Sequence, residues 1–160
     1  LADSVGSRKA LIQSQRYSPY ELGLSRLVSL DKGPFVGRAA LAAERRARPR
    51  RKIVGLEIEW SGVEARYDKV GLAPVAPAAT SRVAVPVVRG SRQIGRATTT
   101  AWSPTLKRLI ALATVDKPYY DEGTRVEFEI TVEGVRHFVG ARVVRTPFFN
   151  PPRKTATPPA

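Results

Sequence analysis

Few side chains of this chain have the type and spacing that acid–base chemistry needs. Two carboxylate pairs, Glu57/Glu59 and Asp121/Glu122, are candidates, but the first should face solvent from a predicted strand and the second lies in a predicted turn. His137 is the single histidine, and the sequence shows no partner that would orient it as a general base. We therefore expect structural roles for these residues and assign no catalytic residue.

The motifs of common enzyme classes are absent from the sequence. It contains no P-loop, GxGxxG, GxSxG or HExxH pattern. It has no cysteine, which excludes disulfides, thiolate metal sites and a cysteine nucleophile, and one histidine cannot build a histidine-rich metal site. No metal ligand is assigned.

Four aromatic side chains could stack on a flat ligand. Large aromatics at strand ends more often cover the end of a β-barrel than bind a ligand. We expect this structural role for Trp60, Trp102, Tyr119 and Tyr120.

The formal net charge of +13 favours anionic partners, namely nucleic acid, anionic lipid or polyanionic small molecules such as polyglutamylated cofactors. Six of the nine residues in positions 44–52, ERRARPRRK, are basic. A solvated helix end and linker is the main interpretation of this run, because cations are favoured near a helix C-terminus. A phosphate-binding patch is the alternative.

The sequence lacks the features of a membrane or exported protein. It has no run of about 18 apolar residues, and its first 30 residues lack the apolar segment of a signal peptide. We expect no membrane association and a cytoplasmic location. The chain begins with Leu1 and contains no methionine, so we interpret it as a piece of a longer polypeptide.

Helical features are confined to the first third of the chain. Residues 5–16 have weak helical character, and residues 24–30 are a strand or an extended segment. A turn follows at residues 31–34, DKGP. Strong helix formers then predict a helix from near Val36 that stops before Pro49.

Beyond Pro49 the apolar residues alternate with polar ones, as in strands with one buried face. The alternation runs from Val54 through Trp60 and again over residues 126–132, and Glu133-Gly134 turns the latter into a further strand that ends near Val144. Three more strands are expected over residues 83–89, 93–100 and 109–115. The prediction is a mainly β fold, a small six-stranded closed barrel, since closure removes exposed edges.

Five phrases, in this order, resemble the C-terminal part of the glycine cleavage T-protein (aminomethyltransferase) family, which includes folate-dependent demethylases and the folate domains of sarcosine and dimethylglycine dehydrogenases. They are SPYELGLSRLVSLDKGPFVGRAAL, RRKIVGLEI, GRATTTAWSPTLKRLIALATV, a strand starting at Gly123-Thr124, and ARVVRTPFFNP. The resemblance covers nearly the whole chain. It implies a jelly-roll-like barrel over residues 48–152, preceded by a short α-containing end of the central folate-binding domain at residues 1–47 and followed by a Pro-rich tail at residues 153–160.

The resemblance also implies a function. The chain would be the C-terminal portion of a tetrahydrofolate-dependent aminomethyltransferase or demethylase, closing one side of the folate cavity, with the catalytic residues upstream and no activity alone. Arg153 and Lys154 follow Pro147-Phe148, and one of these two basic residues would reach the folate glutamate tail. Glu21 would hold a turn and an interdomain contact.

The partners implied are the remainder of the polypeptide and either a lipoyl carrier protein or a flavin domain. The cysteine-containing signature of the family's iron–sulfur-maintenance branch is absent, and the segment GLAPVAPAATSR is longer than the corresponding turn of the T-protein. Nucleic acid is not among the partners that the resemblance implies. Two alternatives stay open: a basic nucleic-acid-binding barrel and a non-catalytic folate module of a flavin-linked amine dehydrogenase.

Overall fold

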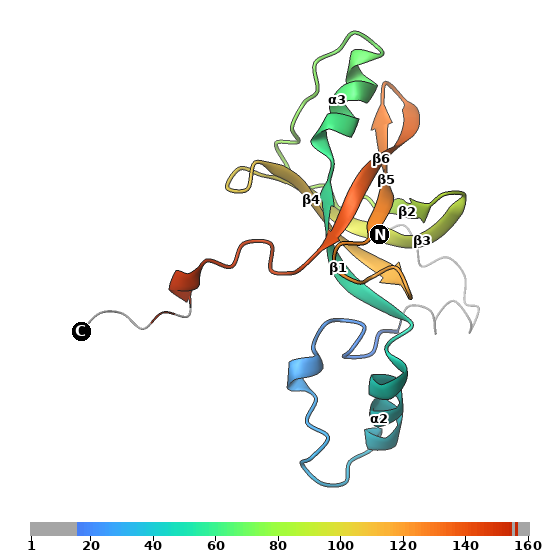
Figure 1. Ribbon diagram of the computed structural model, residues 1–160, viewed down its shortest axis with the longest axis vertical. Helices are drawn as coiled ribbons and strands as arrows, with labels where there is room; N and C mark the ends of the chain where they lie inside the picture. Colours follow the sequence, from blue (N-terminus) through green and yellow to red (C-terminus); the bar gives the residue numbers. More distant parts are fainter. Residues whose placement is uncertain (1–15, 155, 157–160) are drawn as a thin grey trace. The chain divides into compact units, whose positions relative to one another are not determined.

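The computed structural model describes residues 16–154 and Ala156 (Figure 1). The predicted helix over residues 5–16 lies almost entirely outside the described residues. The contacts divide the chain into two compact units with their boundary between Lys52 and Ile53.

The first unit contains the predicted helix. Helix α2 (Arg38–Ala47) follows Gly37, whose φ of 89° is the left-handed conformation that glycine adopts without strain. It ends at Ala47, and Arg48, which has non-helical backbone angles, separates it from Pro49, whose ring and missing N–H cannot continue a helix. Residues 24–30 were predicted to form a strand or an extended segment, and the strand prediction is wrong. A short 3₁₀ helix, η1 (Ser25–Leu27), lies there.

The second unit is a closed barrel, and the six-stranded prediction is confirmed. Strand β1 (Arg51–Ile58) begins two residues before the unit boundary. The other elements of this unit are α3 (Trp60–Asp68), β2 (Val85–Arg89), β3 (Arg92–Ser103), β4 (Arg108–Asp116), β5 (Arg125–Val132), β6 (Val135–Val144) and the 3₁₀ helix η2 (Pro152–Lys154). The strand order around the barrel is β1-β4-β3-β2-β5-β6. Five neighbouring pairs are antiparallel by register, so the sixth pair, β1 with β4, must be antiparallel as well.

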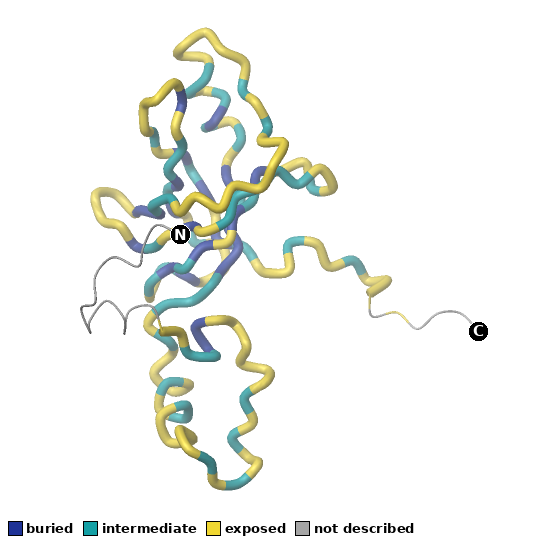
Figure 2. Tube along the Cα trace, turned by 180° about the vertical axis from the view of Figure 1, so that it is seen from behind, coloured by how far each residue is buried: buried dark blue, intermediate teal, exposed yellow. Residues whose placement is uncertain are grey.

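The core lies inside the barrel, as the alternation predicted. Figure 2 shows the buried residues gathered on the strands, and α2 contains none. The most deeply buried large side chains come from five different strands: Leu56, Ile94, Val87, Val115 and Val143. The inward-facing side chains of all six strands therefore form one apolar cluster.

The hairpin between β5 and β6 is confirmed in detail. Glu133 and Gly134 have φ values of 47° and 75°, both left-handed, which is the geometry of a tight turn matched to the twist of two antiparallel strands. Val132 and Val135 pair directly across this turn.

One predicted element boundary is wrong. The alternation through Trp60 was interpreted as strand, but β1 ends at Ile58 and Trp60 begins α3. The ring of Trp60 lies 4.9 Å from that of Trp102, centroid to centroid, and both pack on the core. Tyr119 also packs on the core and Tyr120 is buried within it, so the predicted structural role of the four aromatics is confirmed.

Candidate functional site

The two residues expected to meet a ligand lie in the short helix after β6. Arg153 and Lys154 form the end of η2 and are exposed. The Lys154 Nζ donates a hydrogen bond to the Phe149 carbonyl oxygen at 3.0 Å, whereas the Arg153 guanidinium makes no hydrogen bond or ion pair within the described residues.

The segment leading to η2 is fixed on the barrel by an aromatic contact. A Cβ at Gly55 of β1 would lie 2.7 Å from the Phe148 Cε1 atom, so the ring occupies the space that a side chain would need. Phe148 also lines a groove of about 390 Å³ together with Glu57, Arg108 and Arg145. In this groove Arg108 donates to the Glu57 carboxylate. Glu57 is thus ion-paired rather than free for acid–base chemistry.

The other candidate acids and bases show no catalytic arrangement. His137 lies opposite Ile130 in the β5–β6 pair, and its imidazole makes no hydrogen bond in the described part of the chain. Asp121 and Glu122 are exposed in a turn. Glu59 precedes α3 with its carboxylate against Gly140. Residues 16–154 contain no group of three or more potential metal-ligating His, Cys, Asp or Glu side chains.

Glu21 holds a turn in the first unit, as expected. The Ser18 N–H donates to Glu21 Oε2 and the Glu21 N–H donates back to Ser18 Oγ, both at 3.1 Å. The Ser18 hydroxyl also donates to Glu44 of α2 at 2.5 Å. The spacing S-x-x-E is the sequence pattern of such a reciprocal pair.

Arg51 belongs to the basic run by sequence, but in the structure it makes defined contacts that its place in the run does not predict. Its Nε donates to Glu21 Oε1 at 3.2 Å, its Nη2 donates to the Arg16 carbonyl oxygen at 2.7 Å, and its guanidinium lies 4.0 Å from the Tyr17 ring centroid. Both side chains of the Arg51–Glu21 pair are only 12% exposed. The neighbouring Arg45, Arg46 and Arg50 are exposed, as a solvated helix end requires.

Removing the Glu21 carboxylate should loosen this turn. In Glu21→Ala the Arg51 charge and the Ser18 N–H lose their acceptor, and we expect a local loss of about 1–3 kcal/mol. Hydrogen exchange in the 160-residue chain measures it as faster exchange of the Ser18 amide, which loses its acceptor. Glu122→Ala, at an exposed position, is the control; equal exchange in the two variants would contradict the role assigned to Glu21.

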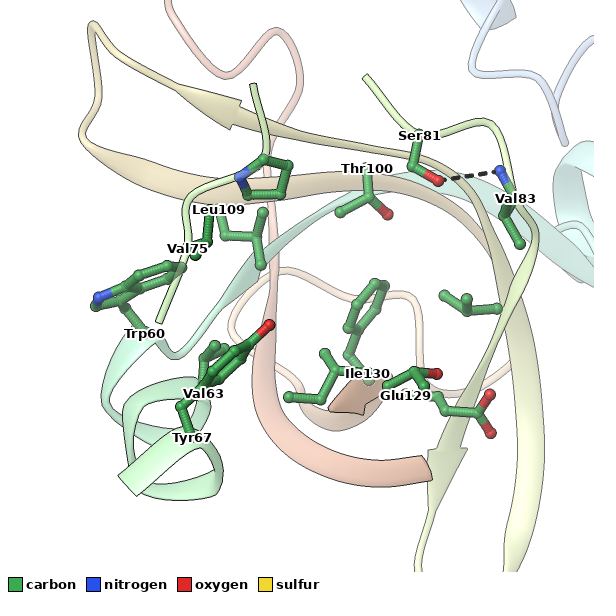
Figure 3. A pocket seen from close by; sticks show the side chains of 14 residues that line it. Trp60, Val63, Tyr67, Val75, Ser81, Val83, Thr100, Leu109, Glu129 and Ile130 are labelled. Carbon is green, nitrogen blue, oxygen red and sulfur yellow. Dashed lines mark hydrogen bonds between the residues drawn. The ribbon is translucent and has the colours of Figure 1, made fainter. Parts of the chain in front are cut away.

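A second pocket, of about 340 Å³, opens at the end of the barrel next to α3 (Figure 3). Figure 3 shows Trp60, Val63 and Tyr67 on one side of it and Ser81 and Val83 on the other. The sequence did not reveal this pocket, because the segment before β2 that borders it has no regular pattern.

The family model for the glycine cleavage T-protein C-terminal barrel domain matches residues 51–150, which include all six strands. The chain belongs to this family. Among curated relatives, the aminomethyltransferase of Symbiobacterium thermophilum is 37% identical over 142 residues, which are 88% of this chain and 32% of that protein. The aminomethyltransferase of Moorella thermoacetica is 38% identical over 137 residues, 86% of this chain and 32% of that protein.

A solved structure of the glycine cleavage system aminomethyltransferase T from Bartonella henselae shares the fold. The match has a TM-score of 0.59 and 20% identity, and it covers 82% of this chain and 32% of that chain. The chain thus spans about a third of the length of these members of the T-protein family. In the described residues, no helix has the length and apolarity to cross a bilayer.

Proposed function

We propose that this chain is the C-terminal portion of a tetrahydrofolate-dependent one-carbon transferase, an aminomethyltransferase or demethylase. The observation that carries the proposal is its 37–38% identity to two aminomethyltransferases over a barrel that makes up about a third of each. The catalytic residues would lie in the preceding polypeptide. The barrel would close one side of the folate cavity.

The residues of the C-terminal segment suit one part of this cofactor. Tetrahydrofolate, when bound, supplies the nitrogen atoms that carry the one-carbon unit, and its glutamate tail carries carboxylates. An exposed guanidinium without a protein acceptor can hold a carboxylate through two parallel hydrogen bonds. Arg153 meets this description, whereas Lys154 already donates to Phe149. We therefore assign the main tail contact to Arg153 and a weaker one to Lys154.

Arg153→Ala in the complete enzyme should raise the Kd for a polyglutamylated tetrahydrofolate roughly tenfold, because a charge-assisted contact is lost. Lys154→Ala should have a smaller effect. Isothermal titration measures both, with Arg92→Ala, an exposed arginine of the β2–β3 hairpin, as the control. If Arg92→Ala weakened binding as much as Arg153→Ala, the contact would be a general charge effect.

The proposed function is tested by placing this chain in a related enzyme in exchange for the matching region. The 160-residue chain alone should transfer no one-carbon unit to tetrahydrofolate. The same chain should support folate-dependent transfer when it replaces the matching region of the Moorella thermoacetica aminomethyltransferase. Turnover by the isolated chain would show that catalysis does not depend on the preceding polypeptide.

The cellular setting follows from the same proposal. The parent enzyme would act in the cytoplasm and receive its one-carbon unit from a lipoyl carrier protein or from an amine oxidised by a fused flavin domain. Mass spectrometry of the parent protein purified from its own cells distinguishes the two, since a fused flavin domain adds its mass to the same polypeptide.

A further inference from the structure

Two arginines lie directly opposite each other on the outer face of the barrel. Arg125 of β5 pairs with Arg142 of β6, and both residues are exposed. Their neighbours Val126, Ala141 and Val143 are buried, so the alternation of side chains along the two strands places both arginines outside. Two like charges therefore share one place on the barrel wall.

The hydrogen-bond pattern of the two strands brings these side chains close together. The Val143 N–H donates to the Thr124 carbonyl oxygen at 2.9 Å, which makes these two residues a hydrogen-bonded pair. The next pair, Arg125 with Arg142, is then a non-hydrogen-bonded pair, the kind in which Cα atoms are only about 4.5 Å apart and side chains lie closest. Like charges at directly opposite positions destabilise a sheet.

The nearest carboxylates of the barrel wall do not neutralise this pair. Glu57 of β1 lies opposite Arg142 on the other side of β6, but it accepts from Arg108 of β4. Glu127, on the same face of β5, accepts from the Gly90 N–H at 3.1 Å. In the part of the chain that the structure describes, neither guanidinium of the pair makes a hydrogen bond or an ion pair.

A third arginine adds to the positive charge. Arg89 Nη1 donates to the Arg125 carbonyl oxygen at 2.5 Å, so the Arg89 side chain lies across the start of β5. The acids of the turn before β5, Asp121 and Glu122, form no ion pair with these arginines among the described residues. The three guanidinium groups therefore have no carboxylate partner there.

The charge and the donors of the pair match one kind of anion. A guanidinium holds a phosphate group through two parallel N–H···O hydrogen bonds. A phosphate monoester carries about 1.5 to 2 negative charges at pH 7, enough to neutralise both arginines, whereas chloride, a carboxylate or a phosphodiester carries one. An anion between the two arginines would also remove their repulsion. Local conflicts of this kind are kept in proteins mostly at functional sites.

We propose that Arg125 and Arg142 form a binding site for the phosphate group of a phosphate monoester. Each guanidinium would donate to the phosphate oxygens, and Arg89 would add positive charge beside them. The site uses none of the residues assigned to the folate tail. The proposal concerns the barrel unit and stands whether or not the parent enzyme uses folate.

Inorganic phosphate and glycerol 3-phosphate are suitable probes, because both carry the dianionic group. Binding is measured on the 160-residue chain at low ionic strength by ¹H–¹⁵N correlation spectra during titration, and urea unfolding is followed with and without the probe. Both probes should shift the amides of Arg125 and Arg142 and raise the urea midpoint of the barrel. Sodium chloride at the same ionic strength should do neither. No shift of these amides up to millimolar concentrations, or an equal effect of chloride, would overturn the proposal.

Two variants separate the pair from the general positive charge of the chain. Arg125→Gln should weaken phosphate binding about tenfold. Without phosphate it should raise the urea midpoint, because the like-charge repulsion ends. Arg96→Gln is the matched control, since Arg96 is exposed on β3 between Pro86 and Thr114, which carry no charge. Equal losses of binding in the two variants, or a midpoint of Arg125→Gln no higher than that of Arg96→Gln, would overturn the proposal.

An oligothymidine without terminal phosphates separates a phosphate monoester from a nucleic-acid backbone, because each of its phosphodiesters carries one charge. Its affinity should fall by the same small factor in Arg125→Gln and Arg96→Gln, as a general charge effect requires. A tenfold loss of oligothymidine binding confined to Arg125→Gln would assign the pair to nucleic acid and overturn the assignment to a phosphate monoester.

Discussion

Leu56→Ala is expected to lower the free energy of unfolding of the barrel by about 2–5 kcal/mol. Leu56 is 0% exposed and comes from β1, which pairs with β6 through Leu56 and Val143 among others. Truncation removes buried methyl groups and leaves a cavity that a closed ring of strands cannot easily collapse. Urea unfolding measures the loss through tryptophan fluorescence, which reports on the barrel because Trp60 and Trp102 are the only tryptophans of the chain.

Leu112→Ala is the matched control for this prediction. Leu112 lies on β4 and is 37% exposed, so the same atoms are removed from a site that already contacts water. Its cost should stay below about 1 kcal/mol. Similar losses in the two variants would mean that the apolar interior does not determine the stability of the barrel.

Gly95→Ala is expected to destabilise the barrel by about 2–3 kcal/mol, through overlap rather than a cavity. Gly95 lies on β3 opposite Val115 of β4, and an added Cβ would overlap the Thr114 carbonyl oxygen and lie 3.0 Å from the Val115 Cα atom. Both neighbours are backbone atoms, so the two strands would have to separate. The same fluorescence measurement in urea detects the effect.

Gly62→Ala tests whether the effect of Gly95→Ala comes from the overlap. Gly62 lies within α3, and the nearest atom to an added Cβ is the Val139 Cβ at 3.4 Å, an ordinary contact. Alanine is a better helix former than glycine by about 1 kcal/mol, so this variant should be neutral or more stable. A loss as large as that of Gly95→Ala would show that alanine is costly at glycine positions for another reason.

The barrel was predictable because apolar and polar residues alternate along its strands. Val126 and Phe128 alternate with Arg125 and Glu127, and the structure buries the first two inside the barrel. The turn at Glu133-Gly134 was predictable as well, because glycine at position 134 adopts the left-handed backbone that a tight hairpin turn needs. Local patterns therefore determined the fold class, which the structure confirms.

The features that the sequence did not predict depend on contacts between residues that are far apart in the chain. The alternation of apolar residues continues to Trp60, but a helix begins there, and tertiary packing of its ring on Trp102 was not visible in the local pattern. Arg51 belongs to a basic run by sequence, yet Glu21, thirty positions earlier, holds it. The pocket next to α3 arises where β2 and β5 separate, which no local pattern records. The predicted domain limits and the roles of Arg153 and Lys154 stay predictions.

The place of β1 in the ring has a consequence for synthesis of the protein. Of the six strands, β1 leaves the ribosome first and β6 leaves last. These two strands are neighbours in the barrel and pair at Gly55 and Val144, among other positions. At roughly 5–20 residues per second, β1 waits on the order of 10 s for this neighbour. During that time the β2–β3–β4 meander can pair by itself, while β1 presents an unpaired edge to other nascent chains. A stop codon before β6 should therefore produce aggregation rather than a smaller soluble barrel.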